Sequence, residues 1–226
     1  NPLITPEHVA PSREGFEVVG TFNAGAFEHD GRIGLLVRVA ERPLHNDPAT
    51  VLVPVFDVRT SPPEVEFVTL RRDDPTWDFS DPRAVAPRKG GRGLHHYLTS
   101  VSHLRIAWSD DGRRFHLDDP ANSLWPANEY ERFGIEDARV TTIDRLHLIT
   151  YTAVSERGVC VALATTADFR RFARHGIGFP LDNKDVAVFP RRIGGEYVTL
   201  HRPAGTWCRP GMWLARSPDL IHWGRH

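Results

Sequence analysis

The sequence predicts an all-β fold, because two features of its 226 residues are typical of sheets rather than helices. Helical periodicity is almost absent, and short runs rich in β-branched residues take its place. Gly-containing turn pairs such as Asp30-Gly31 and Gly194-Gly195 separate these runs. The runs predict strands at 32–39, 50–58, 103–109, 146–154, 159–166 and 196–203.

A repeated sequence frame indicates how these strands are grouped. The frame Ala-x-Ser/Thr-x-Asp-x-x-x-aromatic occurs at 107–115, 164–172 and 215–223. A repeat of about 50 residues with four strands has the size of one blade of a β-propeller. We expect the Asp of each copy to form the turn between the outer strands and the aromatic residue to pack between blades.

A second repeated element lies upstream of each frame. The segments "NAGAFEHDGRIGLLVR", "DARVTTIDRLHLITYT" and "DVAVFPRRIGGEYVTLHR" each read as a polar residue, an apolar strand, a tight turn and another apolar strand. The first strand of a propeller blade lines the central channel. Asn23, Asp137 and Asp185, which lead these segments, should therefore meet in one pocket at one end of the channel.

Residues 71–98 and the number of repeats limit the possible domain organisation. Residues 71–98 are polar and rich in Pro and Gly, which predicts a loop insertion that covers the channel mouth or packs on the rim. Because a closed propeller needs four or more blades, we expect residues 1–226 to form a single propeller domain that covers only part of the ring. Further blades after residue 226, or a partner, would close it.

Composition excludes several classes of function. A net charge of −1 disfavours nucleic acid and anionic membranes as partners, and no apolar run approaches the roughly 18 residues of a membrane span. Two cysteines, Cys160 and Cys208, are too few for a disulfide framework, so we expect a cytoplasmic protein. The twelve histidines form no metal-binding motif, and we predict no metal and no cofactor. The sequence does not decide whether the protein forms a homo-oligomer.

The stretch "FGIEDARV" (133–140) places Glu136, Asp137 and Arg139 next to an apolar strand. Burying charge is costly unless the charge is paired or used, so this is either a structural ion pair or part of an active site. Adjacent strand residues point to opposite faces, which predicts that Arg139, and not Glu136, lies beside Asp137. Lys184 is one of only two lysines among 28 basic residues, a weak sign that a compact charge is required there.

Four motifs together resemble one family. They are "FNAGAF" with "GLLVRVAER" (22–42), "GIEDARVTTIDRLHLITYT" (134–152), "NKDVAVFPRRIGGEYVTLHRP" (183–203) and "MWLARSPDLIHWG" (212–224). In order and approximate spacing they are similar to the inverting β-mannoside phosphorylases and mannosidases of glycoside hydrolase family 130, which are five-bladed propellers. The likeness covers nearly the whole chain apart from 43–98. The motifs "NKDVAVFP" and "HRP" look more like the phosphorylases of β-1,2-linked mannosides than those of β-1,4-linked ones.

The resemblance implies a role for individual residues. Asp137 matches the general acid, although the family commonly has Pro where this chain has Ala138. The family's further phosphate ligands, a lysine and a histidine, come from blades beyond this chain. A sugar platform at Tyr130 or Trp125 is a weaker expectation. The implied sugar contacts are Asn23, Arg38, Arg139, Asp185 and Tyr130, and the implied phosphate contacts are Lys184, Arg202 and His201, the last of which could equally be a core histidine.

The chemistry implied by the resemblance needs one acid. Glycoside cleavage ordinarily uses two carboxyl groups, but in an inverting phosphorylase inorganic phosphate is itself the nucleophile. We therefore expect a β-mannoside oligosaccharide and phosphate as substrates, with α-mannose 1-phosphate as product and phosphate held by basic side chains. Two alternatives stay open: a hydrolase of the same fold that uses water and a second carboxylate, and a non-catalytic glycan-binding propeller.

Overall fold

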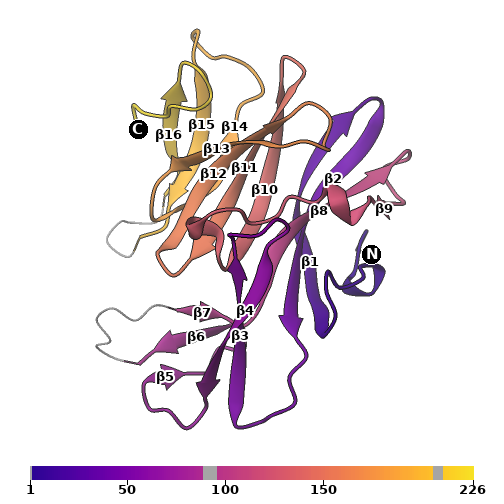
Figure 1. Cartoon of the computed structure of the whole chain (residues 1–226). Coiled ribbons are helices and arrows are strands. Elements are labelled where there is room, and N and C mark those ends of the chain that lie inside the picture. The colour runs from indigo at the N-terminus through magenta and orange to yellow at the C-terminus, as the bar shows by residue number, and fades with distance from the viewer. Residues whose placement is uncertain (1, 89–95, 206–210) are drawn as a thin grey trace.

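A computed structural model describes residues 2–88, 96–205 and 211–226, and it is all-β (Figure 1). Three antiparallel units, two of four strands and one of three, follow one another along the chain. In the first unit, β1 (Phe16–His29), β2 (Arg32–Pro43), β8 (Val101–Ser109) and β9 (His116–Leu117) pair antiparallel in that order. The Asp30-Gly31 turn predicted from the sequence joins β1 to β2, with both residues in the left-handed region.

The second unit has the same plan. Strands β10 (Gly134–Ile143), β11 (Leu146–Ser155), β12 (Gly158–Thr166) and β13 (Ala173–Phe179) form an antiparallel meander. It joins the first unit through one parallel pairing of Gly134 with Ser102. A Cβ atom on Gly134 would lie 2.5 Å from the Ser102 nitrogen, so this close approach requires glycine.

The third unit contains β14 (Asn183–Val188), β15 (Tyr197–Pro203) and β16 (Trp213–Ser217). A bridge from Arg216 to Gly224 begins a fourth strand position. All six runs predicted to be strands are strands in the structure. Three short 3-10 helices, η1 (Pro6–His8), η2 (Pro120–Asn122) and η3 (Glu129–Glu131), complete the connections.

The repeated frame has the same hydrogen bonds in every copy. In each, the Ser or Thr hydroxyl accepts a backbone N–H three residues on, and the Asp carboxylate accepts the N–H groups two and three residues beyond itself. This confirms the predicted Asp turn. The aromatic residues differ in surroundings: Phe172 packs on the core between units one and two, Trp223 on the core between units two and three, and Phe115 within unit one.

The apolar cores lie largely between the units. One cluster joins β1, β2 and β8 of the first unit to β10, β11 and β12 of the second, with Phe27 stacked on Phe169. Another joins the second unit to the third through Val161, Phe179 and Val186. Burial of apolar side chains from two neighbouring sheets is what fixes the position of one unit against the next.

The largest departure from the regular plan lies between β2 and β8, which are neighbours in the sheet although residues 44–100 separate them. This excursion contains the hairpin of β3 (Thr50–Asp57) and β4 (Glu64–Arg71), and Figure 1 shows it at the end of the molecule away from β13–β16.

The predicted loop at 71–98 is in part a small sheet, made of β5 (Trp77–Asp78), β6 (Ala84–Pro87) and β7 (Tyr97–Leu98). Strands of two to four residues are too short to show alternation in a sequence, which is why the pattern indicated a loop. Residues 89–95, within this prediction, and Cys208 lie outside the described residues.

Candidate active site

The site is built on a backbone irregularity that occurs once in the first strand of each unit. Asn23, Asp137 and Asp185 have φ values of 51°, 52° and 58°, in the left-handed region that Asn and Asp tolerate better than most residues. The strand register shifts at each of them, as in a β-bulge. The three residues aligned from the sequence thus have equivalent backbone conformations within β1, β10 and β14.

The first two bulges come together in space because β1 packs against β10. Gly25, just after the first bulge, makes this possible: a Cβ atom there would lie 2.8 Å from the Ala138 carbonyl oxygen. The side-chain amide of Asn23 donates a hydrogen bond to Oδ1 of Asp137 at 3.0 Å. Two of the three residues predicted to meet are therefore in contact, whereas the side-chain partner of the third, Asp185, is Arg202.

Arg38 is the centre of the resulting cluster. Its Nη1 donates to Asp137 Oδ1 at 3.1 Å, its Nη2 to Glu136 Oε1 at 2.6 Å, and its Nε to the Ser102 hydroxyl at 3.1 Å. The guanidinium also lies 4.5 Å from the centre of the Phe22 ring, a cation–π distance. All five donors are on a planar fork, so these contacts fix the orientation of both carboxylates.

Glu136 is the residue of this cluster that sequence reasoning missed. Strand alternation predicted that it faces away from Asp137, but the left-handed bulge turns both carboxylates toward Arg38. Burial raises the pKa of Glu136, and the charge of Asp137 adds to this, while Arg38 and Lys184 oppose it. The signal that could have identified Glu136 is Arg38 itself, a charged residue on an apolar strand that needed a partner.

The prediction that Arg139 orients Asp137 is wrong. Arg139 is exposed, and among the described residues it makes no hydrogen bond or ion pair with Asp137. The register shift between Glu136 and Arg139 is the physical reason, because one extra residue in the strand reverses which side chains share a face.

The third bulge carries the basic residues. Lys184 pairs with Arg202 across β14 and β15, and the Arg202 guanidinium closes on Asp185 with contacts of 2.8 and 2.5 Å. Lys184 lies on β14, which packs against β10, the strand that carries Glu136 and Asp137. Its ammonium makes no hydrogen bond or ion pair with the residues that the structure describes. Lys184 is therefore the cation available to a bound anion, whereas Arg202 already has a partner.

Two predicted site residues have other surroundings. His201 is buried, with one ring nitrogen bonded to the Asn183 side chain and the other to His226, and burial lowers its pKa. Tyr130, in η3, packs on the core, and the guanidinium of Arg157 lies 5.2 Å from its ring centre. Among the described residues, neither side chain contacts the Arg38 cluster.

A cleft opens beside the cluster. This cleft, about 550 Å³ in volume, is called the proximal cleft below. It has Arg38 and Glu136 in one wall, next to Asp137, and residues of the excursion, including Leu98 and Thr99, in the opposite wall. Its volume is in the range of pockets that bind small molecules. A ligand in it would face the Arg38–Glu136 pair and a mixed lining that includes Asp81, Arg83 and Leu98.

In the described part of the chain, no three His, Cys, Asp or Glu side chains are grouped as metal ligands. No helix among the described residues is long and apolar enough to cross a membrane.

Comparison with known proteins gives three findings. Residues 93–226 match the family model of glycoside hydrolase 130, described as β-1,4-mannooligosaccharide phosphorylase. The whole chain is 47% identical to the β-1,2-mannobiose phosphorylase of Listeria innocua, and covers 63% of it. A 1,2-β-oligomannan phosphorylase of Thermoanaerobacter is 36% identical over 58% of this chain and 43% of that protein.

Solved structures agree with the sequence comparisons. The Listeria innocua enzyme in complex with β-1,2-mannobiose superposes with a TM-score of 0.93, over 100% of this chain and 63% of the other. A glycoside hydrolase structure from Parabacteroides distasonis, 22% identical, has a TM-score of 0.61 over 99% of this chain, which shows the fold alone. The whole of this chain therefore aligns with less than two thirds of the Listeria innocua enzyme.

Proposed function

The chain belongs to the glycoside hydrolase 130 family. From that premise we propose that it contains the general acid of an inverting β-mannoside phosphorylase. The substrate class that we propose is β-1,2-linked mannobiose and short mannooligosaccharides, cleaved by inorganic phosphate to give α-mannose 1-phosphate. The identity of 47% with a β-1,2-mannobiose phosphorylase supports this linkage over the β-1,4 linkage of the family description. Two cysteines without a disulfide framework support a cytoplasmic location.

The observation that carries the proposal is the contact of Asp137 with both Arg38 and Asn23. Two donors on one oxygen, Oδ1, hold the carboxyl group in a single orientation. Its other oxygen has no hydrogen bond among the described residues and is available to a sugar hydroxyl or to the leaving oxygen. Proton transfer from a positioned acid to the leaving group contributes typically 10²–10⁴-fold to a rate.

Phosphate supplies the nucleophile in this proposal. The bond between the anomeric carbon and the leaving oxygen breaks as a phosphate oxygen attacks from the opposite face, which inverts the anomeric configuration. The proton from Asp137 goes to the departing sugar, directly or through a sugar hydroxyl. Lys184 would hold the phosphate as a point charge, with Arg202 beside it on the paired strand. His201 and Tyr130 have no part in it.

The arrangement disfavours the hydrolytic alternative within the described residues. An inverting hydrolase needs a second carboxylate across an open space that holds the attacking water, with the two groups about 6.5–9.5 Å apart. Glu136 is the carboxylate beside Asp137, and it shares the Arg38 guanidinium with Asp137 rather than facing it. It is therefore not placed as the base.

We also propose that the three units are successive blades of a five-bladed propeller. The first strands β1, β10 and β14 would line its axis, and the residues of the excursion would cover part of the channel mouth. The remaining blades would belong to the part of the relatives that this chain does not span.

The experiment is to incubate the protein with β-1,2-mannobiose, with and without inorganic phosphate, and to identify the sugar products by NMR. We expect α-mannose 1-phosphate and mannose, formed only with phosphate. Free mannose released at the same rate without phosphate would instead establish a hydrolase. Saturable binding of mannobiose with no turnover under either condition would establish a binding module.

A further inference from the structure

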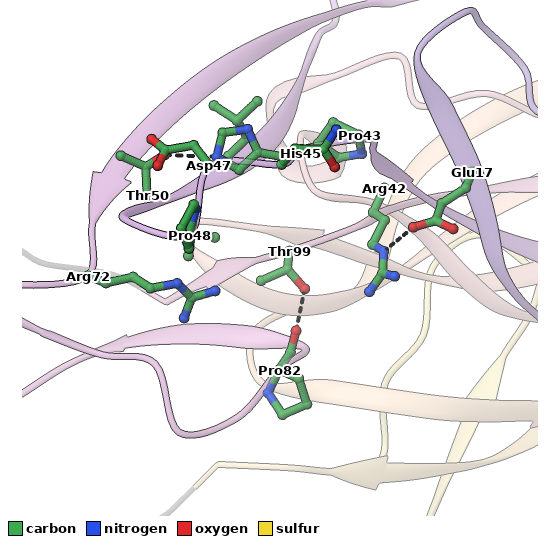
Figure 2. Close-up of a pocket in the computed structure, with 13 residues that line it drawn as sticks. Glu17, Arg42, Pro43, His45, Asp47, Pro48, Thr50, Arg72, Pro82 and Thr99 are labelled. Carbon is green, nitrogen blue, oxygen red and sulfur yellow. Dashed lines mark hydrogen bonds and ion pairs between the residues drawn. The ribbon is translucent and has the colours of Figure 1, made fainter.

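A second pocket adjoins the proximal cleft on the side away from Asp137. It has a volume of about 350 Å³ and is called the distal pocket below. The end of β2, the loop 44–49 and the start of β3 line it together with Arg72, Pro82 and Thr99 from later in the excursion. Figure 2 shows Arg42 and Arg72 on opposite sides of the pocket, with Pro82 and Thr99 between them.

The two cavities adjoin each other. Arg42, Pro82 and Thr99 line both of them. At the other end of the proximal cleft, Arg38 and Glu136 are in direct contact with the Asp137 cluster. A chain molecule that has its cleaved bond at Asp137 and extends through the proximal cleft would bring its later units to the distal pocket.

The chemistry of the distal pocket suits a neutral, hydroxyl-rich ligand. Arg42 and Arg72 supply donors, while Glu17 and Asp47 supply acceptors, so the charges nearly cancel. Sugar hydroxyls donate and accept, and they use both kinds of group, whereas a phosphate dianion would gain little net attraction from a lining whose charges cancel. The rings of Pro43, Pro48 and Pro82 add apolar surface against which the C–H face of a sugar can pack.

Arg72 is the side chain best placed to recognise such a ligand. Arg42 is already paired with Glu17 at 2.7 Å. The guanidinium of Arg72 lies 5.6 Å from the ring centre of Phe79, and among the described residues it makes no side-chain hydrogen bond or ion pair. Its N–H donors are therefore free for a ligand. Because the guanidinium already lies over the Phe79 ring, the side chain loses less conformational entropy when it binds.

We propose that the distal pocket is a binding site for the mannosyl units of oligosaccharides longer than the disaccharide, with Arg72 as the residue that selects for chain length. This rests on the proposed function, since it assumes that the first sugar lies at Asp137. It names a substrate class: β-1,2-linked mannooligosaccharides of three or more units, and not mannobiose alone.

The test compares mannotriose with mannobiose in the Arg72→Ala variant. The quantity measured is the ratio of kcat/KM for the triose to kcat/KM for the biose, with phosphate present. Loss of a hydrogen bond from a charged group should lower this ratio by about tenfold. Arg71→Ala is the matched control, because Arg71 is an exposed neighbour paired with Asp73 and lies outside both cavities, and it should leave the ratio as in the parent protein.

An unchanged ratio in Arg72→Ala, or an equal fall in Arg71→Ala, would overturn the proposal. If neither sugar is phosphorolysed by the parent protein, the proposed function fails, and calorimetric binding of mannotriose then decides the distal pocket. Binding by the parent and by Arg71→Ala, weakened about tenfold in Arg72→Ala, would support a sugar site in the distal pocket. No binding, or equal binding by all three proteins, would contradict a sugar site in the distal pocket.

Discussion

The first and third units have the same backbone at the site but use it differently. Each has a left-handed residue in its first strand, Asn23 in one and Asp185 in the other, and each has an arginine opposite the preceding residue. Arg202 closes on Asp185 within its own unit, in a pair that is about 40% exposed. Arg38, whose own unit offers an amide instead of a carboxylate, reaches into the next unit and contacts Glu136 and Asp137.

In these two units the partner of the arginine differs together with the side chain at the bulge. A carboxylate at the left-handed position satisfies the arginine locally and makes an ordinary ion pair. An amide leaves the guanidinium to a neighbouring unit, where it is 16% exposed and organises the acid. The same repeated element thus forms an ion pair within the third unit and a contact from the first unit to the acid of the second.

The largest difference between the two units is expected when each arginine is replaced by alanine. In Arg38→Ala, Glu136 and Asp137 lose the cation that they share in a largely buried site, and the unfolding free energy should fall by about 3 kcal/mol or more. In Arg202→Ala the pair lost is much more exposed, and the fall should be under about 1 kcal/mol. Urea unfolding of both variants measures this, and equal losses would contradict the contrast.

A smaller effect is expected from the amide of the first bulge. Asn23→Gly keeps the left-handed backbone and removes only the hydrogen bond to Asp137, so kcat/KM for mannobiose should fall by about tenfold. Asn23→Ala should reduce stability by about a further 1 kcal/mol, because alanine is strained at this φ. If the glycine variant keeps full activity, the amide has no role in orienting the acid.

The pH dependence of stability tests whether the pKa of Glu136 is raised in the folded protein. Burial raises its pKa above the ordinary 4.5, so the folded protein binds this proton more tightly than the unfolded chain does. Compared with Glu136→Gln, the parent protein should be relatively most stable below pH 4.5 and lose that advantage as pH rises until the folded carboxyl group has ionised. The slope cannot exceed about 1.4 kcal/mol per pH unit.

Asp57 provides the control of opposite sign for this experiment. Its hydrogen bonds from Arg59 hold its pKa at about 2, below the ordinary 3.8. Compared with Asp57→Asn, the parent should therefore gain stability as pH rises between about 2 and 3.8. Urea unfolding across pH gives both curves, and a rising curve for Glu136 would contradict the effect assigned to burial.

Much of the fold could be predicted from the sequence because its signals are local. The six β-rich runs, the Asp turns of the repeated frame and the leading positions of Asn23, Asp137 and Asp185 depend on residues close together in the chain. The strands β5–β7 could not be predicted, since none is longer than four residues.

The candidate site was predictable only in part, for a geometrical reason. The convergence of Asn23 and Asp137 followed from the alignment of the repeats. The partners of Asp137 did not, because a bulge reverses the alternation of side chains, so that Glu136 joins the cluster and Arg139 leaves it. Whether an arginine pairs within its unit or across units is a long-range choice, which no local pattern records.

The central claim, that the second bulge holds the general acid and the third does not, is tested by one kinetic measurement. Asp137→Asn and Asp185→Asn make the same substitution at equivalent positions, and Asp144→Asn, at an exposed turn with similar φ, is the reference. We predict that kcat for mannobiose phosphorolysis falls by about 10²–10⁴-fold in Asp137→Asn and stays within about tenfold of the reference in Asp185→Asn. An Asp137→Asn protein that retains the kcat of the reference would contradict the claim.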